Sequence, residues 1–424
     1  MNRESTERRT FLKTAGAVGA FTILQPRLVR GTEANSAVRV GLLGCGRRGS
    51  THAGNIIQNT GARLTALADL FPDQLDKARQ NFDNANRAKG YPGVSQTFVG
   101  PHAYRQIAES KEVDAVVIAT PAYFHPEHLR AVVAAGKHVY LEKPVAVDVA
   151  GARRVLETGK QAEGRISLDV GFQIRSAPPF VELVRRIHAG ALGEIAAGEA
   201  HYYCPAQDER HWAGATGDVL RLRNWIQDRV LSGDIIVEQN IHAIDICNWV
   251  LKGHPVSAIG RGGREGRGAP GDDCYSHFDA IFVYPGNVHV SFNSTQFGKG
   301  PFEVSQRFFG TRGASQSPYT GALGIAGDEP WTWAGSESQG QTGAFSASGS
   351  FSDNLAEADT EKKKSFLGSI ASGQFHNQAA LGVETALTAM LGRRAAYTGR
   401  EVTWDELLRS NEHWESRIDI DKLA

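Results

Sequence analysis

Hydrophobic and polar stretches alternate along the first third of the chain in the manner of strands and helices. Val38 to Leu43 and Val113 to Thr120 are largely apolar runs, which are typical of strands buried on both faces of a parallel sheet. Glu127 to Ala135 then shows helical spacing, and Lys137 to Leu141 has the composition of a further strand. This alternation predicts a doubly wound α/β domain at residues 38–158.

Short strands dominate the next part of the chain, residues 159–395. Pro285-Gly286-Asn287 separates two of them and is a strong hairpin signal. These runs predict an α+β domain with a mostly antiparallel sheet. The predicted strands are Glu194–Tyr203, Phe278–Tyr284, Val288–Phe297 and Phe302–Gly310. Ser336 to Ser352 is rich in Gly and Ser and predicts a long loop, Asn377 to Leu391 predicts a helix, and residues 396–424 form a closing strand and helix extension.

Length and charge narrow the class of protein. A chain of 424 residues can form two domains with additional segments. Its 46 Lys and Arg residues balance 46 Asp and Glu residues, so neither nucleic acid nor an anionic membrane is an expected partner. No apolar run is long enough to span a membrane, and no Cys or His grouping has zinc spacing, so we expect no metal site.

The first 37 residues resemble a twin-arginine export signal. Arg8-Arg9-Thr10-Phe11-Leu12-Lys13 carries the motif, although Glu7 stands where Ser or Thr is more usual. The apolar run from Ala15 to Leu24 is too short and too rich in Gly and Ala for a transmembrane helix. We therefore expect export to the periplasm, with cleavage near Ala34–Ala37. A disordered charged tail is the alternative interpretation.

A glycine motif follows the first predicted strand. In Gly44-x-Gly46-x-x-Gly49, the first glycine permits a tight turn, the second lets the backbone approach a pyrophosphate, and the third allows close packing of helix on strand. The helix that begins here offers free N–H groups to phosphates. The motif predicts a dinucleotide site, and a purely structural turn is the alternative.

Asp69 supplies the second half of this signature. It ends the strand-like run Ala66 to Asp69, 20 residues after Gly49, where a carboxylate can accept hydrogen bonds from the adenosine ribose. A carboxylate there would repel the 2′-phosphate of NADP, which favours NAD. NADP remains the alternative cofactor, because Arg47 and Arg48 lie in the same loop.

Several motifs together resemble the Gfo/Idh/MocA family of oxidoreductases, named for glucose-fructose oxidoreductase and inositol dehydrogenase. The resemblance covers nearly all of the chain after the export signal. The motifs are Gly44 to Gly49, Thr120-Pro121 with His125, Glu142-Lys143-Pro144, Glu238-x-x-x-His242-x-x-Asp245, and Gly399 to Trp404. The resemblance implies a Rossmann domain and a second domain whose open sheet covers the substrate and often mediates oligomerisation, here as a homodimer or homotetramer. It implies a sugar, a cyclic polyol or a derivative as substrate.

The candidate cofactor residues follow from the motif, the topology and this resemblance. Ligands bind such sheets at the carboxyl ends of the strands. The candidates are Gly44, Gly46, Arg47, Arg48, Gly49, Asp69, Thr120, Pro121, His125, Glu142 and Lys143.

The candidate catalytic residues are Lys143, His242 and Glu238. Oxidation of a secondary alcohol needs a base to take the hydroxyl proton, and Lys143 and His242 suit this task. Glu238 and His242 lie four residues apart in an apolar-periodic stretch, so we expect them to share a helix face, with the carboxylate orienting the imidazole. The family more often has Asp at the position of Glu238. The resemblance also implies a cis Lys143-Pro144 bond. A satisfied helix histidine is the alternative for His242.

Four further residues are candidates for substrate contact: Arg175, His201, Tyr203 and Asp245. Each has a structural alternative. An ion pair suits Arg175, and helix packing suits Asp245. The cluster of His201, Tyr202, Tyr203, His211 and Trp212 can stack on and hydrogen-bond a sugar, although an ordinary sheet face looks similar.

These observations predict an exported NAD(P)-dependent oxidoreductase that acts on a sugar or sugar derivative and holds its cofactor tightly. Tight binding is expected because twin-arginine export carries folded proteins and the periplasm holds little free NAD. Two alternatives remain. One is a redox-neutral, NAD-dependent glycosidase on the same scaffold, and the other is a non-catalytic binding protein.

Overall fold

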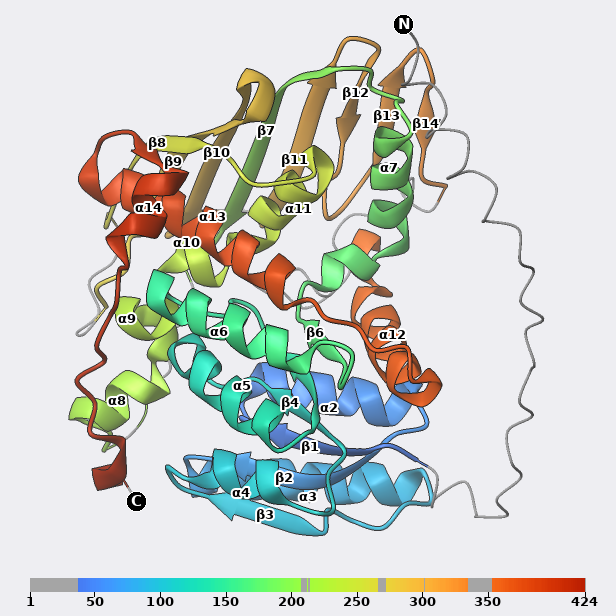
Figure 1. Ribbon diagram of the computed structural model, residues 1–424, viewed down its shortest axis with the longest axis vertical. Coiled ribbons are helices and arrows are strands. Elements are labelled where there is room, and N and C mark those ends of the chain that lie inside the picture. The colour runs from blue at the N-terminus through green and yellow to red at the C-terminus, as the bar shows by residue number, and fades with distance from the viewer. Residues whose placement is uncertain are drawn as a thin grey trace, which may run out of the picture. The chain divides into compact units, whose positions relative to one another are not determined.

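The computed structural model describes residues 37–206, 212, 214–265, 272–300, 302–334 and 353–423 (Figure 1). The predicted export signal, the loop from Ser336 to Ser352 and His211 lie outside these residues. Within the described ranges, no helix combines the length and the apolar character needed to cross a membrane.

A six-stranded parallel sheet forms the first part of the molecule, in the order β3-β2-β1-β4-β5-β6. Its strands are β1 (Arg39–Leu43), β2 (Arg63–Asp69), β3 (Gln96–Val99), β4 (Ala115–Ile118), β5 (His138–Leu141) and β6 (Leu168–Val170). The strands alternate with α2 (Arg47–Asn59), α3 (Pro72–Ala88), α4 (Ala103–Glu109), α5 (His125–Ala134) and α6 (Val149–Ala162). The doubly wound sheet predicted from the apolar runs is therefore confirmed.

Helices cover both faces of this sheet, as the apolar character of its strands requires. Val40 and Leu42 of β1 pack into one buried cluster, whereas Leu43 packs into the cluster on the other face. Helices α2 and α3 pack together on one face, and α4, α5 and α6 lie side by side on the other. Alternate residues of each strand therefore belong to different layers of the core.

A nine-stranded mixed sheet forms the second part, in the order β14-β13-β12-β11-β7-β10-β9-β8-β15 (Figure 1). Only β7 and β10 pair in parallel; the other pairs are antiparallel. Its strands are β7 (Ile195–Cys204), β8 (Ser257–Gly263), β9 (His277–Tyr284), β10 (Val288–Gln296), β11 (Glu303–Gly310), β12 (Gly313–Gln316), β13 (Gly324–Gly327), β14 (Trp331–Thr332) and β15 (Val402–Thr403). The prediction of a mostly antiparallel sheet is confirmed.

The predicted hairpin joins β9 to β10. Val288 pairs with Tyr284, and the connecting residues Gly286 and Asn287 have φ values of 77° and 60°. This left-handed backbone favours Gly and Asn, which explains why the turn forms at this point in the sequence.

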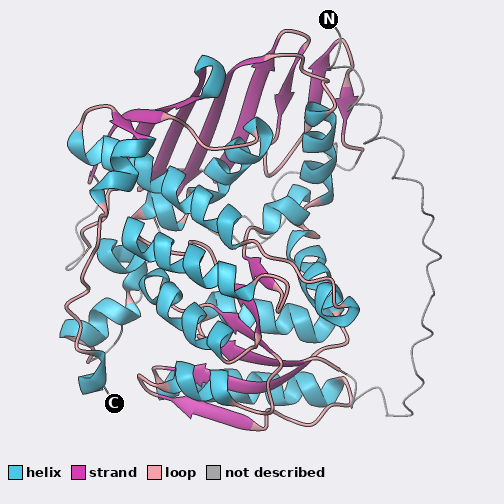
Figure 2. Cartoon of the chain, in the orientation of Figure 1, coloured by secondary structure: helices cyan, strands magenta, loops and turns pink. Residues whose placement is uncertain are grey.

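Within the described residues, helices cover one face of the nine-stranded sheet and leave the other uncovered. Helices α7 (Pro178–His188), α11 (Ile241–Leu251) and α13 (Ala379–Thr398) lie along one side of the sheet (Figure 1 and Figure 2). The side chains of β7, β9 and β10 alternate in burial along each strand. We call the opposite face, on which Ile259, Ile281 and Phe309 are exposed, the open face.

Two of the predicted domain boundaries fall within helices of the structure. The boundary predicted after residue 158 falls inside α6, and β6 beyond it still belongs to the first sheet. The boundary predicted after residue 395 falls inside α13. In addition, α12 (Ala358–Ser372) packs against α2 of the first part.

Candidate active site

A cleft of about 1360 Å³ lies at the carboxyl ends of the parallel strands. The glycine loop, Asp69 and Lys143 line one side of it. The other side is formed by the second part of the chain, including α8 (Gly217–Arg223), η3 (Trp225–Gln227) and His242 of α11. This is the edge of a doubly wound sheet at which ligands bind.

The three glycines of the loop have the geometry that a dinucleotide needs. Gly44 has φ 95°, and a Cβ atom there would lie 2.6 Å from the carbonyl oxygen of Ala119. A Cβ atom on Gly49 would lie 2.0 Å from the carbonyl oxygen of Gly44, so helix and strand pack with no side chain between them. By contrast, the space beside Gly46 is open, and this residue lines the cleft. The backbone is therefore accessible at the position where a pyrophosphate would approach.

Asp69 ends β2 and holds the glycine loop. Its Oδ2 accepts a hydrogen bond from the Cys45 N–H at 2.6 Å, and its Oδ1 accepts one from the Phe71 N–H at 2.9 Å. Burial raises the pKa of Asp69, while these two N–H groups act in the opposite direction. The carboxylate lines the cleft, and Arg47 lies exposed nearby on the same cleft wall. The fixed carboxylate fits the ribose position expected for an adenosine nucleotide.

Arg48 differs from the expectation that it would be available to a cofactor. Its Nε lies 3.1 Å from Glu142 Oε1, and its two terminal nitrogens lie 2.9 and 3.0 Å from the carboxylate of Asp359 on α12. Although Arg48 lines the cleft, its guanidinium group is already ion-paired with the carboxylates of Glu142 and Asp359. Pairing of this kind is what allows charged side chains to be buried.

This ion pair belongs to a larger buried network. Glu142 Oε1 also contacts His52 Nε2, and Lys363 Nζ contacts both Asp359 and the Tyr140 hydroxyl, at 3.3 and 2.9 Å. Burial lowers the pKa of His52 to about 4 and that of Lys363 to about 8. His52, Asp359 and Lys363 were not predicted as site residues from the sequence. The only signal was the spacing of Asp359 and Lys363, four residues apart, which is equally typical of a solvated helix face.

The network continues into the Glu-Lys-Pro loop. Glu142 Oε2 accepts a hydrogen bond from the backbone N–H of Lys143 at 2.9 Å, and the Lys143-Pro144 bond is cis. His125, expected at the cofactor, is instead buried behind the cleft. Its Nδ1 lies 2.7 Å from the Pro144 carbonyl oxygen and its Nε2 lies 2.8 Å from that of Thr120. His125 therefore joins the loop at Thr120 to the Glu-Lys-Pro loop. Thr120 and Pro121 themselves line the cleft.

Lys143 reaches across the cleft floor to Glu238. Its Nζ lies 3.0 Å from Glu238 Oε1 and also donates to the Glu238 carbonyl oxygen. The Lys143 and Glu238 side chains are only 9% and 13% exposed. Glu238 therefore orients the lysine, which differs from the expected role of orienting His242.

The predicted single helix through Glu238 and His242 is wrong. Helix α10 (Ile235–Glu238) ends before α11 begins at Ile241. The Ile235 carbonyl oxygen accepts hydrogen bonds from the N–H groups of both Gln239 and Asn240, so the regular ladder loses its register between the two helices. Within the described residues, no hydrogen bond joins Glu238 to His242.

His242 is a buried, neutral imidazole. It is 2% exposed, and its Nδ1 has no hydrogen-bond partner within the described residues. Burial, followed by the charge of Lys143, holds the pKa of His242 well below its usual range. His242 lines the cleft with Lys143 and Glu238, so an unprotonated nitrogen and an ammonium group meet in one place.

Arg175 and Asp245 form an ion pair away from the cleft lining. Arg175 Nε and a terminal nitrogen lie 2.8 and 2.9 Å from the two Asp245 oxygens, and Thr385 donates to the same carboxylate at 3.0 Å. Asp245 is 1% exposed. The structure therefore favours the structural alternative over substrate contact for both residues.

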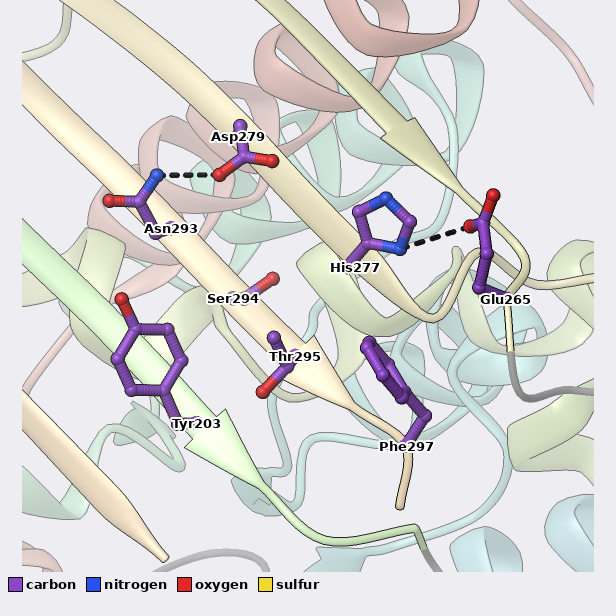
Figure 3. A pocket seen from close by; sticks show the side chains of 8 residues that line it. All are labelled: Tyr203, Glu265, His277, Asp279, Asn293, Ser294, Thr295 and Phe297. Atoms are coloured by element: carbon purple, nitrogen blue, oxygen red, sulfur yellow. Dashed lines mark hydrogen bonds and ion pairs between the residues drawn. The ribbon is translucent and has the colours of Figure 1, made fainter. Parts of the chain in front are cut away.

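His201 and Tyr203 lie on the open face. Their rings stack with centroids 4.7 Å apart, and His201 Nε2 lies 3.1 Å from Glu303. Figure 3 shows Tyr203 beside a separate depression of about 530 Å³ on this face, with His277 and Asn293. The alternation of β7 decides this placement, because Tyr202 between them is fully buried. Of the predicted polar-aromatic cluster, Trp212 does line the cleft, together with Trp225, which the sequence analysis did not identify.

Comparisons with known proteins agree with this architecture. Residues 38–170 match the family model described as "Oxidoreductase family, NAD-binding Rossmann fold", and residues 180–316 match the GFO/IDH/MocA C-terminal domain. Inositol 2-dehydrogenase 4 of Saccharopolyspora erythraea is 33% identical over 226 residues, which cover 53% of this chain and 57% of that protein. A glycosyl hydrolase family 109 protein of Shewanella pealeana is 25% identical over 213 residues, 46% of this chain and 45% of its own length. The chain thus spans about half the length of the curated relatives it matches.

Among solved structures, scyllo-inositol dehydrogenase from Lactobacillus casei with bound NAD(H) and scyllo-inositol shares the fold. Its TM-score is 0.66 at 20% identity, over 87% of this chain and 99% of that one. Together, the two matched domain models and the shared fold assign the protein: the chain belongs to the Gfo/Idh/MocA family of oxidoreductases and carries its NAD-binding Rossmann domain at residues 38–170.

Proposed function

We propose that this protein is an exported NAD-dependent oxidoreductase that oxidises a secondary alcohol of a sugar, a cyclic polyol or a derivative, with a tightly held cofactor. One observation carries the proposal. The neutral His242 imidazole and the Lys143 ammonium line the same cleft as the glycine loop and Asp69. The cofactor residues and the acid-base residues therefore face one shared space.

NAD supplies the hydride acceptor when bound, and the protein supplies binding, orientation and proton transfer. His242 is the proton acceptor, because its imidazole is neutral and its Nδ1 has no hydrogen-bond partner within the described residues. Lys143, held by Glu238, donates a hydrogen bond to the substrate oxygen and stabilises negative charge on it. Glu142 fixes the loop by accepting the N–H of Lys143.

The relatives and the cleft walls support a carbohydrate substrate. The curated relatives include inositol 2-dehydrogenases, and levoglucosan dehydrogenase shares the fold with a TM-score of 0.66 at 18% identity. Trp225 lines the cleft on the wall formed by the second part of the chain. An indole ring presents a flat apolar surface and one N–H donor, which suits the faces and hydroxyls of a sugar ring.

The direct test is to purify the protein and identify the bound nucleotide by absorbance and mass spectrometry. Inositols, sugars and glycosides are then supplied, and NADH absorbance is followed at 340 nm. We expect bound NAD(H) and substrate-dependent reduction, with NAD preferred to NADP because of Asp69. A protein that neither retains nor binds a nicotinamide nucleotide would overturn the proposal.

The similarity to glycosyl hydrolase family 109 proteins supports a second candidate, the redox-neutral glycosidase. The two are distinguished with aryl glycosides and no added nucleotide. Release of the aryl group without net NADH formation assigns the hydrolytic reaction. Net NADH formation without release assigns the dehydrogenase.

Export and tight cofactor binding are linked parts of the proposal. The sequence Arg8-Arg9-x-Phe11-Leu12-Lys13 supports the twin-arginine route, which transports folded proteins. The nucleotide would then be loaded in the cytoplasm and carried with the protein. Replacing Arg8 and Arg9 by Lys should retain the protein in the cytoplasm, which cell fractionation would show.

We further propose that the open face mediates a homodimer or homotetramer. Ile259 and Ile281 pair across β8 and β9 and are 47% and 43% exposed there, and Phe309 on β11 is 42% exposed on the same face. Adjacent exposed apolar side chains such as Ile259 and Ile281 are typical of interaction surfaces. Light scattering of the Ile281→Glu variant tests this, since a charge in the interface should produce monomers. An unchanged mass would exclude the open face.

A further inference from the structure

Two distant segments meet across the cleft beyond Asp69. Arg223 ends α8, and Asp73 lies at the start of α3. The two terminal nitrogens of Arg223 lie 2.7 and 2.6 Å from the two oxygens of Asp73, and the Arg223 side chain is only 14% exposed. A two-pronged pair of this kind is the strong form of an Arg–carboxylate contact.

Aromatic rings hold the Arg223 guanidinium group from two sides. Its central carbon lies 3.9 Å from the ring centre of Phe71 and 4.5 Å from that of Trp212. Phe71 follows Asp69 by two residues, and Phe71, Trp212 and Arg223 all line the cleft. Arg223 therefore lines the cleft close to the carboxylate that the fold places at the adenosine ribose, and it joins this wall to the half-exposed Asp73 at the start of α3.

Helix α8 is itself anchored. Arg221 Nε lies 2.7 Å from Asp228, and the Nη1 of Arg221 donates to the Ser416 carbonyl oxygen at 2.9 Å. Further along the C-terminal segment, Asp421 lies 3.4 Å from His102 of the first part, and Ile420 lines the cleft. Arg223 is thus presented by a supported element, and the C-terminal segment makes a second contact with the first part of the molecule.

We propose that the Arg223–Asp73 pair is a clasp that must open before the dinucleotide leaves, so that it sets the residence time of the cofactor. The proposal rests on the proposed NAD site and deepens it. It assigns the slow release of the cofactor to a contact between the two parts of the molecule. The binding of the cofactor phosphates by the glycine loop contributes separately to affinity.

The experiment measures NADH release from the full-length holoprotein. The protein is loaded with NADH and mixed with excess NAD⁺, and the decay of nucleotide fluorescence gives the dissociation rate. The variants are Arg223→Ala, Asp73→Asn and Arg223→Lys, which keeps the charge and loses the fork. Arg312→Ala is the matched control, because Arg312 pairs with Asp328 and Glu329 at 3.3 and 2.8 Å outside the cleft lining.

We expect release to be at least tenfold faster in Arg223→Ala and Asp73→Asn, intermediate in Arg223→Lys, and unchanged in Arg312→Ala. A variant that combines Arg223→Ala with Asp73→Asn should release NADH no faster than the faster of these two single variants, because each substitution already removes the same Arg223–Asp73 contact. Equal release rates in all proteins would overturn the clasp while leaving the NAD site in place. Failure of the wild-type protein to bind NADH would instead overturn the proposed function.

A further outcome would reassign Arg223. If Arg223→Ala weakens NADPH binding and leaves NADH release unchanged, Arg223 is a ligand of the 2′-phosphate and the clasp is wrong. Asp73→Asn guards against a folding artefact, because it removes the same contact while retaining the side-chain volume at position 73.

Discussion

The cleft and the open face of the nine-stranded sheet contain the same kinds of side chain but use them differently. On the open face, polar groups pair with their neighbours on adjacent strands, as Asn293 does with Asp279 at 2.6 Å and Arg307 with Glu199 at 3.3 Å. In the cleft, polar groups arrive from separate segments. There the Nδ1 atom of His242 has no protein partner within the described residues.

This difference shows that residue type does not identify a site. A histidine beside an aromatic ring occurs on the open face as well as in the cleft. The cleft differs because its polar side chains come from several segments and are buried, and a buried polar atom without a hydrogen-bond partner is costly unless a ligand supplies that partner. The following predictions test that distinction, from the largest expected effect to the smallest.

Replacing Lys143 by Met should have the largest effect. We expect kcat/KM for the substrate alcohol to fall by roughly 10²- to 10³-fold, because the variant removes the ammonium that stabilises negative charge on the substrate oxygen. The matched control is Lys364→Met, since Lys364 is exposed and pairs with Glu361 on the surface of α12. Retention of most activity by the Lys143 variant would mean that the cleft is not the reaction site.

The Arg175–Asp245 pair should matter for stability more than for catalysis. Asp245→Asn should lower the free energy of unfolding by about 3–5 kcal/mol, because it leaves a partly buried guanidinium without its carboxylate. Glu199→Gln breaks the exposed pair with Arg307 and should cost less than about 1 kcal/mol. Urea unfolding compares the two variants. A large change in KM with unchanged stability would return Asp245 to the substrate site.

The buried network should give the protein a pH dependence centred on His52. The unfolded chain binds a proton at this histidine near pH 6.5, whereas the folded protein does so only near pH 4. Between these values the unfolded state binds more protons, so the free energy of unfolding falls as the pH falls, by about 3 kcal/mol for this group. His52→Gln keeps a donor for Glu142 and removes the titration.

The measurement is urea unfolding of wild type and His52→Gln from pH 7 to pH 4. The difference between the two curves isolates His52 from the carboxylates that titrate over the same range. The variant should lose less stability on acidification than the wild type. Parallel curves would show that His52 does not resist protonation in the folded state.

Substitutions on the open face should have the smallest effect on turnover. His201→Ala should change kcat/KM by less than about twofold, because His201 lies outside the cleft lining and pairs with Glu303. Steady-state kinetics at saturating NAD provides the comparison. A loss of tenfold or more would place the open face in the reaction.

The catalytic motifs show how far sequence reasoning extends. Glu142-Lys143-Pro144 and His242 were identified because they lie beside predicted strand ends and within a recognisable helix motif. The partner of Glu238 was not predictable, since the helix breaks at Gln239 and Asn240, where two amides share the Ile235 carbonyl oxygen. The apolar periodicity of this stretch predicts an unbroken helical hydrogen-bond ladder. The side chain of Gln239 at the break instead accepts a buried hydrogen bond from Gln296, a tertiary contact that local sequence does not specify.

The sequence by itself determined the parallel sheet, the dinucleotide loop, the β9–β10 hairpin and the family, because these depend on local patterns of apolar residues, Gly and short motifs. Only the tertiary structure decided the partners of the buried charges. Arg48 and Asp359 lie 311 residues apart, and nothing in either local sequence specifies the other. Tertiary structure also decided which face of β7 His201 occupies. The physical reason is that ion pairing and burial depend on distance in space, whereas motif and periodicity report only on neighbours along the chain.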